Sequence, residues 1–398
     1  MSVFVTDGNQ RATLALTRAL GSCGIEVTVG ESEASLAGAS RWCSRHVVYP
    51  SPLHDPAGFQ EFLHAEMATG RYRVLLPMTD VTTQLVACVR DRSPLPVMVP
   101  IPSTESIRRC QDKRETLLAA RSAGIDIPET HMLDDAERIE DVARQVSYPV
   151  VIKPRLSRFL QGQQWVSGGV DYASSPDELI AKYRACDRSI PRPLVQERVC
   201  GDGKGVFLLV WEGELKAAFG HRRIREKPPS GGVSVLRDSV PLDPEVVEKS
   251  VALLKALDWQ GVAMVEFKVD ERDSRPKLME VNGRFWGSLQ LAVDAGMNFP
   301  LMLYRLATGK DVATTFEYRV GVQSRWFLGD VDNLLIRMKH VRNGDSRLCA
   351  ARDFFAPAGH ERYSEIYRPG DPRPGWFELK QWLRDLVRSG AKESRHAR

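Results

Sequence analysis

The chain has 398 residues, which is long enough for two or three globular domains, and its hydrophobic content is 43%. Its net charge of +4 is small for this length and gives no sign of nucleic-acid binding. The seven cysteines form no CxxC pair, and no apolar run approaches the roughly 18 residues of a membrane span. The N-terminus does not have the pattern of a signal peptide. We therefore expect a cytoplasmic protein without a disulfide framework, a zinc site or membrane contact.

The first hundred or so residues have the pattern of an open parallel sheet. A β-rich run at residues 2–6 leads through a glycine turn into an apolar helical stretch, and a second β-rich run follows. This order is typical of an α/β sheet, so we expect a Rossmann-like domain over residues 1–105. An NAD(P)-dependent oxidoreductase is disfavoured, because no GxGxxG joins a strand to a helix. The segment GDGKG at 201–205 precedes a strand and is predicted to be a turn.

Polar residues lie where this predicted domain would bind a ligand. Asp7 and Arg11 fall between the first strand and the first helix, and Thr79 and Asp80 end another buried run. Open α/β sheets bind ligands at such strand ends, so Asp7 and Arg11 are candidate ligand-binding residues. A structural turn and a helix cap explain them equally well.

Two lysines stand at positions that suit contact with phosphate. Lys113 follows Asp112 at the start of a predicted helix, and Lys153 ends the buried run PVVIK. A lysine there can deliver a point charge to a phosphate oxygen, although each lysine taken alone is more often a surface residue. Residues 155–169, between this strand and the next, are predicted to form a long loop.

Two apolar strands, VEFKVD and KLMEVN, are joined by a polar turn centred near Asp273. If they pair about that centre, Glu266 and Glu280 lie opposite one another, and Asn282 lies on the same face. Paired carboxylates repel unless a cation neutralises them, and oxygen ligands suit Mg²⁺ or Mn²⁺ bound with a phosphate. An exposed hairpin face with solvated charges explains an isolated ExNxR equally well, but the apolar neighbours favour burial.

A basic segment, HRRIREKPPSGGVS, precedes this hairpin in the chain. Arg222, Arg223 and Arg225 surround one acid, and Ser230 and Gly231 follow in a turn-forming sequence. Clustered guanidinium groups can hold a carboxylate and offset the charge of an acyl phosphate. A solvated basic loop is the alternative, in a chain with 55 lysines and arginines.

From about Asp112 to Ala295, these motifs occur in the order seen in the ATP-grasp superfamily, which the chain resembles. That order is a first lysine, a strand-ending lysine, a mobile loop, an acidic hinge, an acidic strand residue and a final ExNxR strand. The basic segment resembles that of predicted carboxylate–amine ligases within the superfamily. The resemblance implies a multidomain protein of the α/β and α+β classes, with a two-subdomain ATP-grasp domain over 106–310, a lid at about 125–195 and a helical extension over 311–398.

The resemblance also implies a role for each matching residue. Lys113 and Lys153 would contact the ATP phosphates, and Gln196, Glu197 and Val199 would form the hinge that reads adenine. Glu266, Glu280 and Asn282 would hold Mg²⁺ or Mn²⁺. Arg284 and Arg223 would be catalytic, through stabilisation of the transferred phosphoryl group and the acyl phosphate. Substrates would be bound by Arg222, Arg225, Ser230, Gly231, Asp7 and Arg11.

The function implied is an ATP- and Mg²⁺-dependent ligase that joins a carboxylate to an amine, amino-acid-like or peptide-like, through an acyl phosphate. One alternative is a phosphotransferase or carboxylase of the same fold, and another is a nucleotide-binding regulatory protein without turnover. The expected partners are small molecules, with no nucleic acid or membrane. The apolar helix predicted from residue 333 onwards is compatible with a homodimer.

Overall fold

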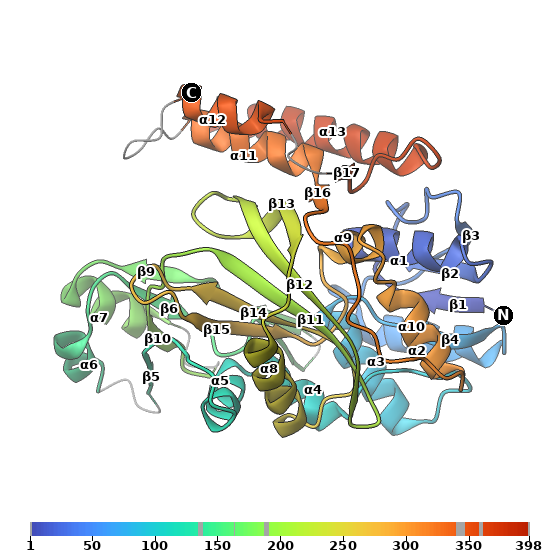
Figure 1. The fold of residues 1–398 in the computed structure, drawn as a ribbon, viewed down its shortest axis with the longest axis horizontal. Coiled ribbons are helices and arrows are strands. Elements are labelled where there is room, and N and C mark those ends of the chain that lie inside the picture. The colour runs from blue at the N-terminus through green and yellow to red at the C-terminus, as the bar shows by residue number, and fades with distance from the viewer. Residues whose placement is uncertain are drawn as a thin grey trace.

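The computed structural model describes residues 2–133, 138–162, 164–186, 191–339, 347–357 and 361–396. Figure 1 shows an N-terminal parallel sheet at one end, a large twisted sheet in the middle and a smaller sheet at the other end. A layer of C-terminal helices lies above the large sheet. None of the helices in the described ranges is both long and apolar enough to cross a membrane.

The N-terminal sheet is open and parallel, as the sequence predicts, and its strand order is β3-β2-β1-β4. Helix α3 begins at a capping box formed by Thr79 and Thr82, which places Asp80 in its first turn at the carboxyl end of β4. The elements are β1 (Ser2–Val5), α1 (Arg11–Gly21), β2 (Glu26–Glu31), β3 (Cys43–Val48), α2 (Pro56–Ala68), β4 (Tyr72–Leu76), α3 (Asp80–Arg92) and α4 (Thr104–Gln111).

The smaller sheet is antiparallel, with order β5-β10-β6-β9, and lies where the lid is predicted. In β6, Val150 and Ile152 are buried in its core, and Lys153 is the last residue of the strand. The elements are α5 (Lys113–Ser122), β5 (Thr130–Met132), α6 (Ile139–Gln145), β6 (Val150–Lys153), β9 (Asp171–Ala173), α7 (Pro176–Ala185) and β10 (Leu194–Glu197).

The predicted loop at 155–169 is instead largely a β-hairpin of β7 (Arg158–Gln161) and β8 (Gln164–Ser167). Leu160 and Trp165 pack against the N-terminal domain, and Trp165 Nε1 donates a hydrogen bond to the carbonyl of Pro52 at 2.8 Å. The turn includes Gly162 at φ +63°, which favours glycine. The sequence contained this turn signal, but the surface that supports two such short strands belongs to another domain, at Pro52 and α3.

The large sheet has seven strands in the order β15-β14-β11-β12-β13-β16-β17. Glu212 and Gly213 both have positive φ and join β11 to β12 in a tight hairpin turn. The predicted turn at 201–205 is only partly correct, because β11 begins at Gly203. The strands are β11 (Gly203–Trp211), β12 (Glu214–Lys227), β13 (Val233–Val240), β14 (Gly261–Val269), β15 (Pro276–Asn282), β16 (Gln323–Arg325) and β17 (Arg362–Ser364).

The predicted C-terminal extension is not wholly helical, because β16 and β17 add two strands to the large sheet. The largest buried apolar cluster joins α1 to α9, α10 and the large sheet, so the N-terminal domain packs firmly against the centre of the molecule. The remaining helices are α8 (Pro244–Ala256), α9 (Leu289–Asp294), α10 (Phe299–Ala307), α11 (Phe327–Lys339), α12 (Arg347–Phe355) and α13 (Arg373–His396).

Candidate active site

The β14–β15 hairpin has the predicted register, with Glu266 directly opposite Glu280. Asn282, two residues further along the same face, donates a hydrogen bond from Nδ2 to Glu280 Oε1 at 3.2 Å. Burial raises the pKa of Glu266 to about 7, and the charge of Glu280 adds to the shift. Burial also acts on Glu280, but Lys113 and Lys153 hold its pKa below the usual value. The hairpin therefore presents concentrated negative charge that lysines from elsewhere partly offset.

The two predicted phosphate lysines both approach this hairpin. Lys153 Nζ donates to Gln196 Oε1 at 3.0 Å, and Lys113 Nζ donates to Ser157 Oγ at 2.7 Å. Burial lowers the pKa of Lys153, and the charge of Glu280 counteracts that shift. The lysines come from different elements, the end of β6 and the start of α5, and their charges converge on one carboxylate.

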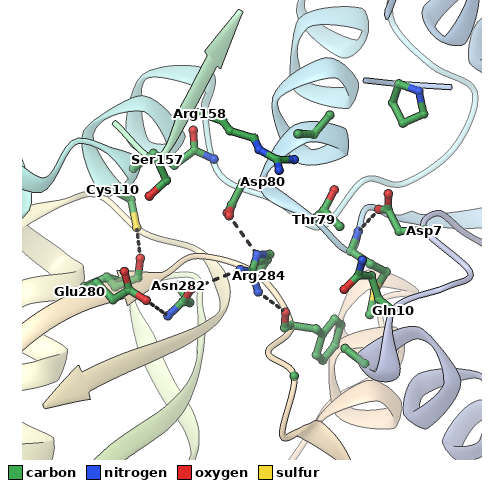
Figure 2. Close-up of a pocket in the computed structure, with 18 of the residues that line it drawn as sticks. Asp7, Gln10, Thr79, Asp80, Cys110, Ser157, Arg158, Glu280, Asn282 and Arg284 are labelled. Atoms are coloured by element: carbon green, nitrogen blue, oxygen red, sulfur yellow. Dashed lines mark hydrogen bonds and ion pairs between the residues drawn. The ribbon is translucent and has the colours of Figure 1, made fainter. Parts of the chain in front are cut away.

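Arg284, just beyond the end of β15, connects the hairpin to the N-terminal domain. Its Nε donates to Asp80 at 3.2 Å and one terminal nitrogen donates to Asn282 Oδ1 at 3.3 Å. Figure 2 shows Glu280, Asn282 and Arg284 in a row along the cavity, with Asp80 reaching Arg284 from α3. Arg284 is thus held beside the candidate metal ligands, as its predicted role requires.

A cavity of about 400 Å³ lies between the N-terminal domain, β15 and the β7–β8 hairpin. Its lining joins residues from all three regions (Figure 2), which include Asp7, Gln10, Thr79, Asp80, Lys113, Ser157, Arg158, Glu280, Asn282, Arg284 and Gly287. The sequence did not single out Gln10, Ser157 or Gly287. They carry no motif of their own, and only the packing of the domains brings them to the cavity.

The two N-terminal candidates lie in different surroundings. Asp7 lines the cavity at φ 58°, and its Oδ2 accepts hydrogen bonds from Thr6 and Thr82, both at 2.6 Å. Burial raises its pKa to about 6. Arg11 instead pairs with Glu365 at 2.6 Å, and its guanidinium lies 4.1 Å from the centre of the Trp326 ring. These hydrogen bonds directly support the structural alternative for Asp7, in which it stabilises the turn and connects strand ends.

The predicted basic loop is mostly strand, because β12 continues to Lys227. Arg223 on β12 reaches across β11 and pairs with Glu266 at 2.5 Å, and it pairs with Glu226 at 3.1 Å. A β-carbon at Gly203 would lie 2.9 Å from Arg223 Cδ, so the glycine leaves room for this crossing. Arg223 is therefore next to the candidate metal carboxylates.

Arg222 and Arg225 are engaged elsewhere. Arg222, which points to the other face of β12, pairs with Asp238 on β13 at 2.7 Å. Arg225 pairs with the buried Asp330 of α11 at 2.6 Å. Neither pairing was evident from the sequence, because the acids lie 16 and 105 residues further along the chain.

Ser230 and Gly231 border a second pocket of about 400 Å³, between the β12–β13 turn, the start of β11 and α11. Its charged lining is mainly basic and comprises Asp202, Arg223, Arg225, Glu226, Lys268 and Arg337. Arg223 lies between this pocket and the carboxylate hairpin, because it lines the pocket and also pairs with Glu266.

The candidate hinge comprises the end of β10 and the residues just after it. The carboxylate of Glu197 is held by Arg272 at 2.6 Å, Lys277 at 2.8 Å and the Glu129 amide at 3.0 Å. Burial opposes the shift, but these donors hold the pKa of Glu197 below its usual value. Val199 is buried, and its carbonyl accepts a hydrogen bond from Lys268 at 3.3 Å.

The donor set of the hairpin suits a hard cation. Among the residues that the structure describes, no group of three or more histidine, cysteine, aspartate or glutamate side chains could hold a metal ion. The candidate set instead has two carboxylates and one amide, which is typical of Mg²⁺ bound together with phosphate oxygens and water. Two lysines nearby supply the charge that such phosphates require.

Comparisons with known proteins show similarity to one family, to several curated proteins and to solved structures. Residues 189–328 match the family described as ATP-grasp in the biosynthetic pathway with Ter operon. The chain is 26% identical over 224 residues to the vancomycin B-type resistance protein VanB of Enterococcus faecalis, across 51% of this chain and 63% of VanB. It spans between 26% and 63% of the length of the first curated relatives that it matches.

Two solved structures share the fold. The L-amino acid ligase of Bacillus licheniformis superposes with a TM-score of 0.61 at 18% identity, over 81% of this chain and 78% of that one. The biotin carboxylase domain of the Hydrogenobacter thermophilus 2-oxoglutarate carboxylase, in complex with MgADP, ADP and bicarbonate, superposes with a TM-score of 0.61 at 15% identity. That match covers 81% of this chain and 73% of the other.

Proposed function

The chain belongs to the ATP-grasp superfamily, and on this premise we propose that it is an ATP- and Mg²⁺-dependent ligase that joins a carboxylate to an amine. The observation that carries the proposal is the largely buried pair Glu266 and Glu280, with Lys113, Lys153 and Arg223 converging on it. Buried acids of like charge are costly unless cations neutralise them. A magnesium ion with ATP phosphates supplies that neutralisation and uses the lysines at the same time.

In the proposed reaction, a carboxylate oxygen of the first substrate attacks the γ-phosphorus of ATP. The bond from that phosphorus to the β-phosphate oxygen breaks, which gives an acyl phosphate and ADP. The amine then attacks the acyl carbon, phosphate leaves, and the nitrogen loses a proton to water or a carboxylate. Glu266, Glu280 and Asn282 would hold Mg²⁺, which would neutralise the phosphate charge.

The chain's own residues have defined tasks in this scheme. Lys113 and Lys153 would bind the phosphates of ATP, and Arg223 and Arg284 would stabilise the charge that develops on the transferred phosphoryl group. The cavity beside Glu280 would hold the reacting carboxylate and amine. The docked β7–β8 hairpin would exclude water, which otherwise hydrolyses an acyl phosphate.

The test is ADP release from ATP in the presence of a panel of carboxylates, each with and without amines. We expect release that requires one carboxylate and one amine together. Release with a carboxylate or hydroxyl compound alone would favour a phosphotransferase, and release that requires bicarbonate would favour a carboxylase. Tight ATP binding with no release under any pair would identify a regulatory protein and contradict the proposal.

A further inference from the structure

Arg237 on β13 is a fully buried arginine that the sequence did not single out. It is the direct cross-strand partner of Arg223 on β12, and cross-strand partners project to the same face of a sheet. The face is the one that carries Glu266 and Glu280, because Glu280, Glu266, Gly205 and His221 align across four strands and Arg223 is two residues beyond His221. The guanidinium groups of a fully buried and a largely buried arginine therefore lie side by side next to the candidate metal ligands.

Each of these arginines is bound to a carboxylate that has a second role. Arg223 pairs with Glu266, a candidate metal ligand. Arg237 pairs with Glu365, which follows β17 in the C-terminal extension and also pairs with Arg11 at 2.6 Å. The extension thus reaches the sheet face where the reaction is proposed.

Several buried polar atoms around the two arginines have no hydrogen-bond partner among the described residues. They are the Nε atoms of Arg223 and Arg237, Oε1 of Glu365, Nε1 of Trp286 and both ring nitrogens of His221. The rings of His221 and Trp286 both pack on Phe207, at 4.6 and 4.0 Å between centroids. Buried polar groups are normally hydrogen-bonded, so this concentration of unpartnered polar atoms, most of which are donors, indicates a ligand.

The charges indicate the sign of that ligand. A metal ion at Glu266 would draw its carboxylate away from Arg223. Among the described residues, the direct ion pairs of Arg11, Arg223 and Arg237 would then be those with Glu226 and Glu365. Glu280, which also acts on Arg223, would bind the same metal ion, and burial raises the pKa of Glu378, the acid near Arg11, to about 7. Burial lowers the pKa of His221 well below its usual value, which favours a neutral ring. These direct ion pairs would then hold three cations and two acids, and such an excess of positive charge in a largely buried place favours an anion.

We propose that Arg223 and Arg237 form a paired-guanidinium site that binds the carboxylate of the acyl substrate and the phosphoryl group it receives, and that Glu365 positions Arg237 for this task. The inference rests on the proposed ligase function. Two adjacent guanidinium groups match the geometry of carboxylate and phosphoryl oxygens. Because one metal ligand is shared with Arg223, binding of MgADP and of the anion should strengthen one another.

Inorganic phosphate, a product of the proposed reaction, is the probe. Its dissociation constant is measured by calorimetry with the full chain, with and without saturating MgADP. We expect MgADP to tighten phosphate binding by about tenfold, and Arg237→Met to weaken it by about tenfold or more with MgADP affinity unchanged. Wild-type protein that binds no phosphate with MgADP present, or a folded Arg237→Met protein with wild-type phosphate affinity, would overturn the proposal.

Glu365→Gln provides a second test with the opposite sign, should Arg237→Met not fold. The substitution removes the negative charge that competes for Arg237, so phosphate should bind more tightly and should restore thermal stability lost by the variant. A structural role alone would instead weaken phosphate binding along with stability, and that result would refute the positioning role of Glu365.

Arg325→Met is the matched control, because Arg325 is a half-buried arginine on the adjacent strand that holds Asp330 on the opposite face of the sheet. Its phosphate affinity should equal that of the wild type, and an equal loss in both variants would overturn the site. Failure of the ligase proposal is distinguishable, since it leaves phosphate binding sensitive to Arg237 while no carboxylate–amine pair releases ADP.

Discussion

The large sheet holds two largely buried cross-strand pairs of like charge, Glu266 with Glu280 on β14–β15 and Arg223 with Arg237 on β12–β13. Such pairs destabilise a fold unless opposite charges compensate them. The acids are compensated by cations from three other elements, but the arginines are compensated in part by one of the acids themselves. The acidic pair is thus prepared for cations, and the basic pair becomes available for an anion once a cation has bound.

The largest expected effect comes from removing one acid of the first pair. Glu280→Gln keeps the shape of the side chain but removes a proposed metal ligand and the carboxylate that Lys113 and Lys153 face. We expect turnover to fall by about 10³-fold or more, since charge stabilisation by a metal site is lost. ADP release under saturating ATP and Mg²⁺ measures this. Wild-type activity in the folded variant would remove the metal assignment.

Removing the residue that connects the two pairs should have the next largest effect. Arg223→Met deletes the cation beside Glu266, so we expect turnover to fall by about 10²-fold, with Arg223→Lys intermediate because lysine restores the charge without the planar fork. Steady-state kinetics for the three proteins measure the effect. Equal loss in the methionine and lysine variants would show that guanidinium geometry, and not charge alone, carries the role.

The β7–β8 hairpin borders the cavity that lies beside the acidic pair, and we propose that it keeps water out. Trp165→Ala removes the hydrogen bond to Pro52 and the apolar contact with the N-terminal domain. We expect a severalfold increase in ADP release that is not coupled to amide formation, because a less firmly docked hairpin admits water. The ratio of ADP to amide product measures the coupling. An unchanged ratio would argue against a shielding role for the hairpin.

Asp7 is a buried acid that, within the described part of the chain, forms no ion pair. It therefore shows the free-energy cost of burying a charged group without a neighbouring opposite charge, which ion pairs reduce in the other two cases. Burial raises its pKa from 3.8 to about 6. Its contribution to stability is therefore fully present below about pH 3.8 and is lost as the pH rises through 6, a change of about 2–3 kcal/mol. Asp7→Asn should flatten the stability profile between these values in denaturant titrations. A profile with the wild-type slope would contradict this.

Much of the acidic site was predictable from the sequence, because its two strands are neighbours in the chain and a short turn fixes their register. The proximity of Lys113 and Lys153 to the site was also predictable, since one lies at the start of a helix and the other at the end of a strand. The partners of the basic strand were not. Arg237 meets Glu365 only because β16 and β17 return to the large sheet, and no local pattern encodes a contact over more than 100 residues.

In the hinge, too, the partners of a side chain could not be predicted from the sequence. Glu197 had the position expected of a residue that reads adenine, but Arg272 and Lys277 hold its carboxylate. Both cations lie in or beside the turn that joins β14 and β15, and their orientation depends on how the lid packs against that turn. A motif fixes the type of residue at a position, whereas the partner that occupies its side chain depends on the tertiary structure.

The central claim, an acyl phosphate formed at the acidic pair, is tested most directly by isotope transfer. A carboxylate substrate found in the ADP-release panel is labelled with ¹⁸O in its carboxyl group, and the inorganic phosphate formed during turnover is examined by mass spectrometry. The account predicts that each phosphate released carries one ¹⁸O atom from the carboxylate. Phosphate without label, formed at the same rate as the amide, would contradict it.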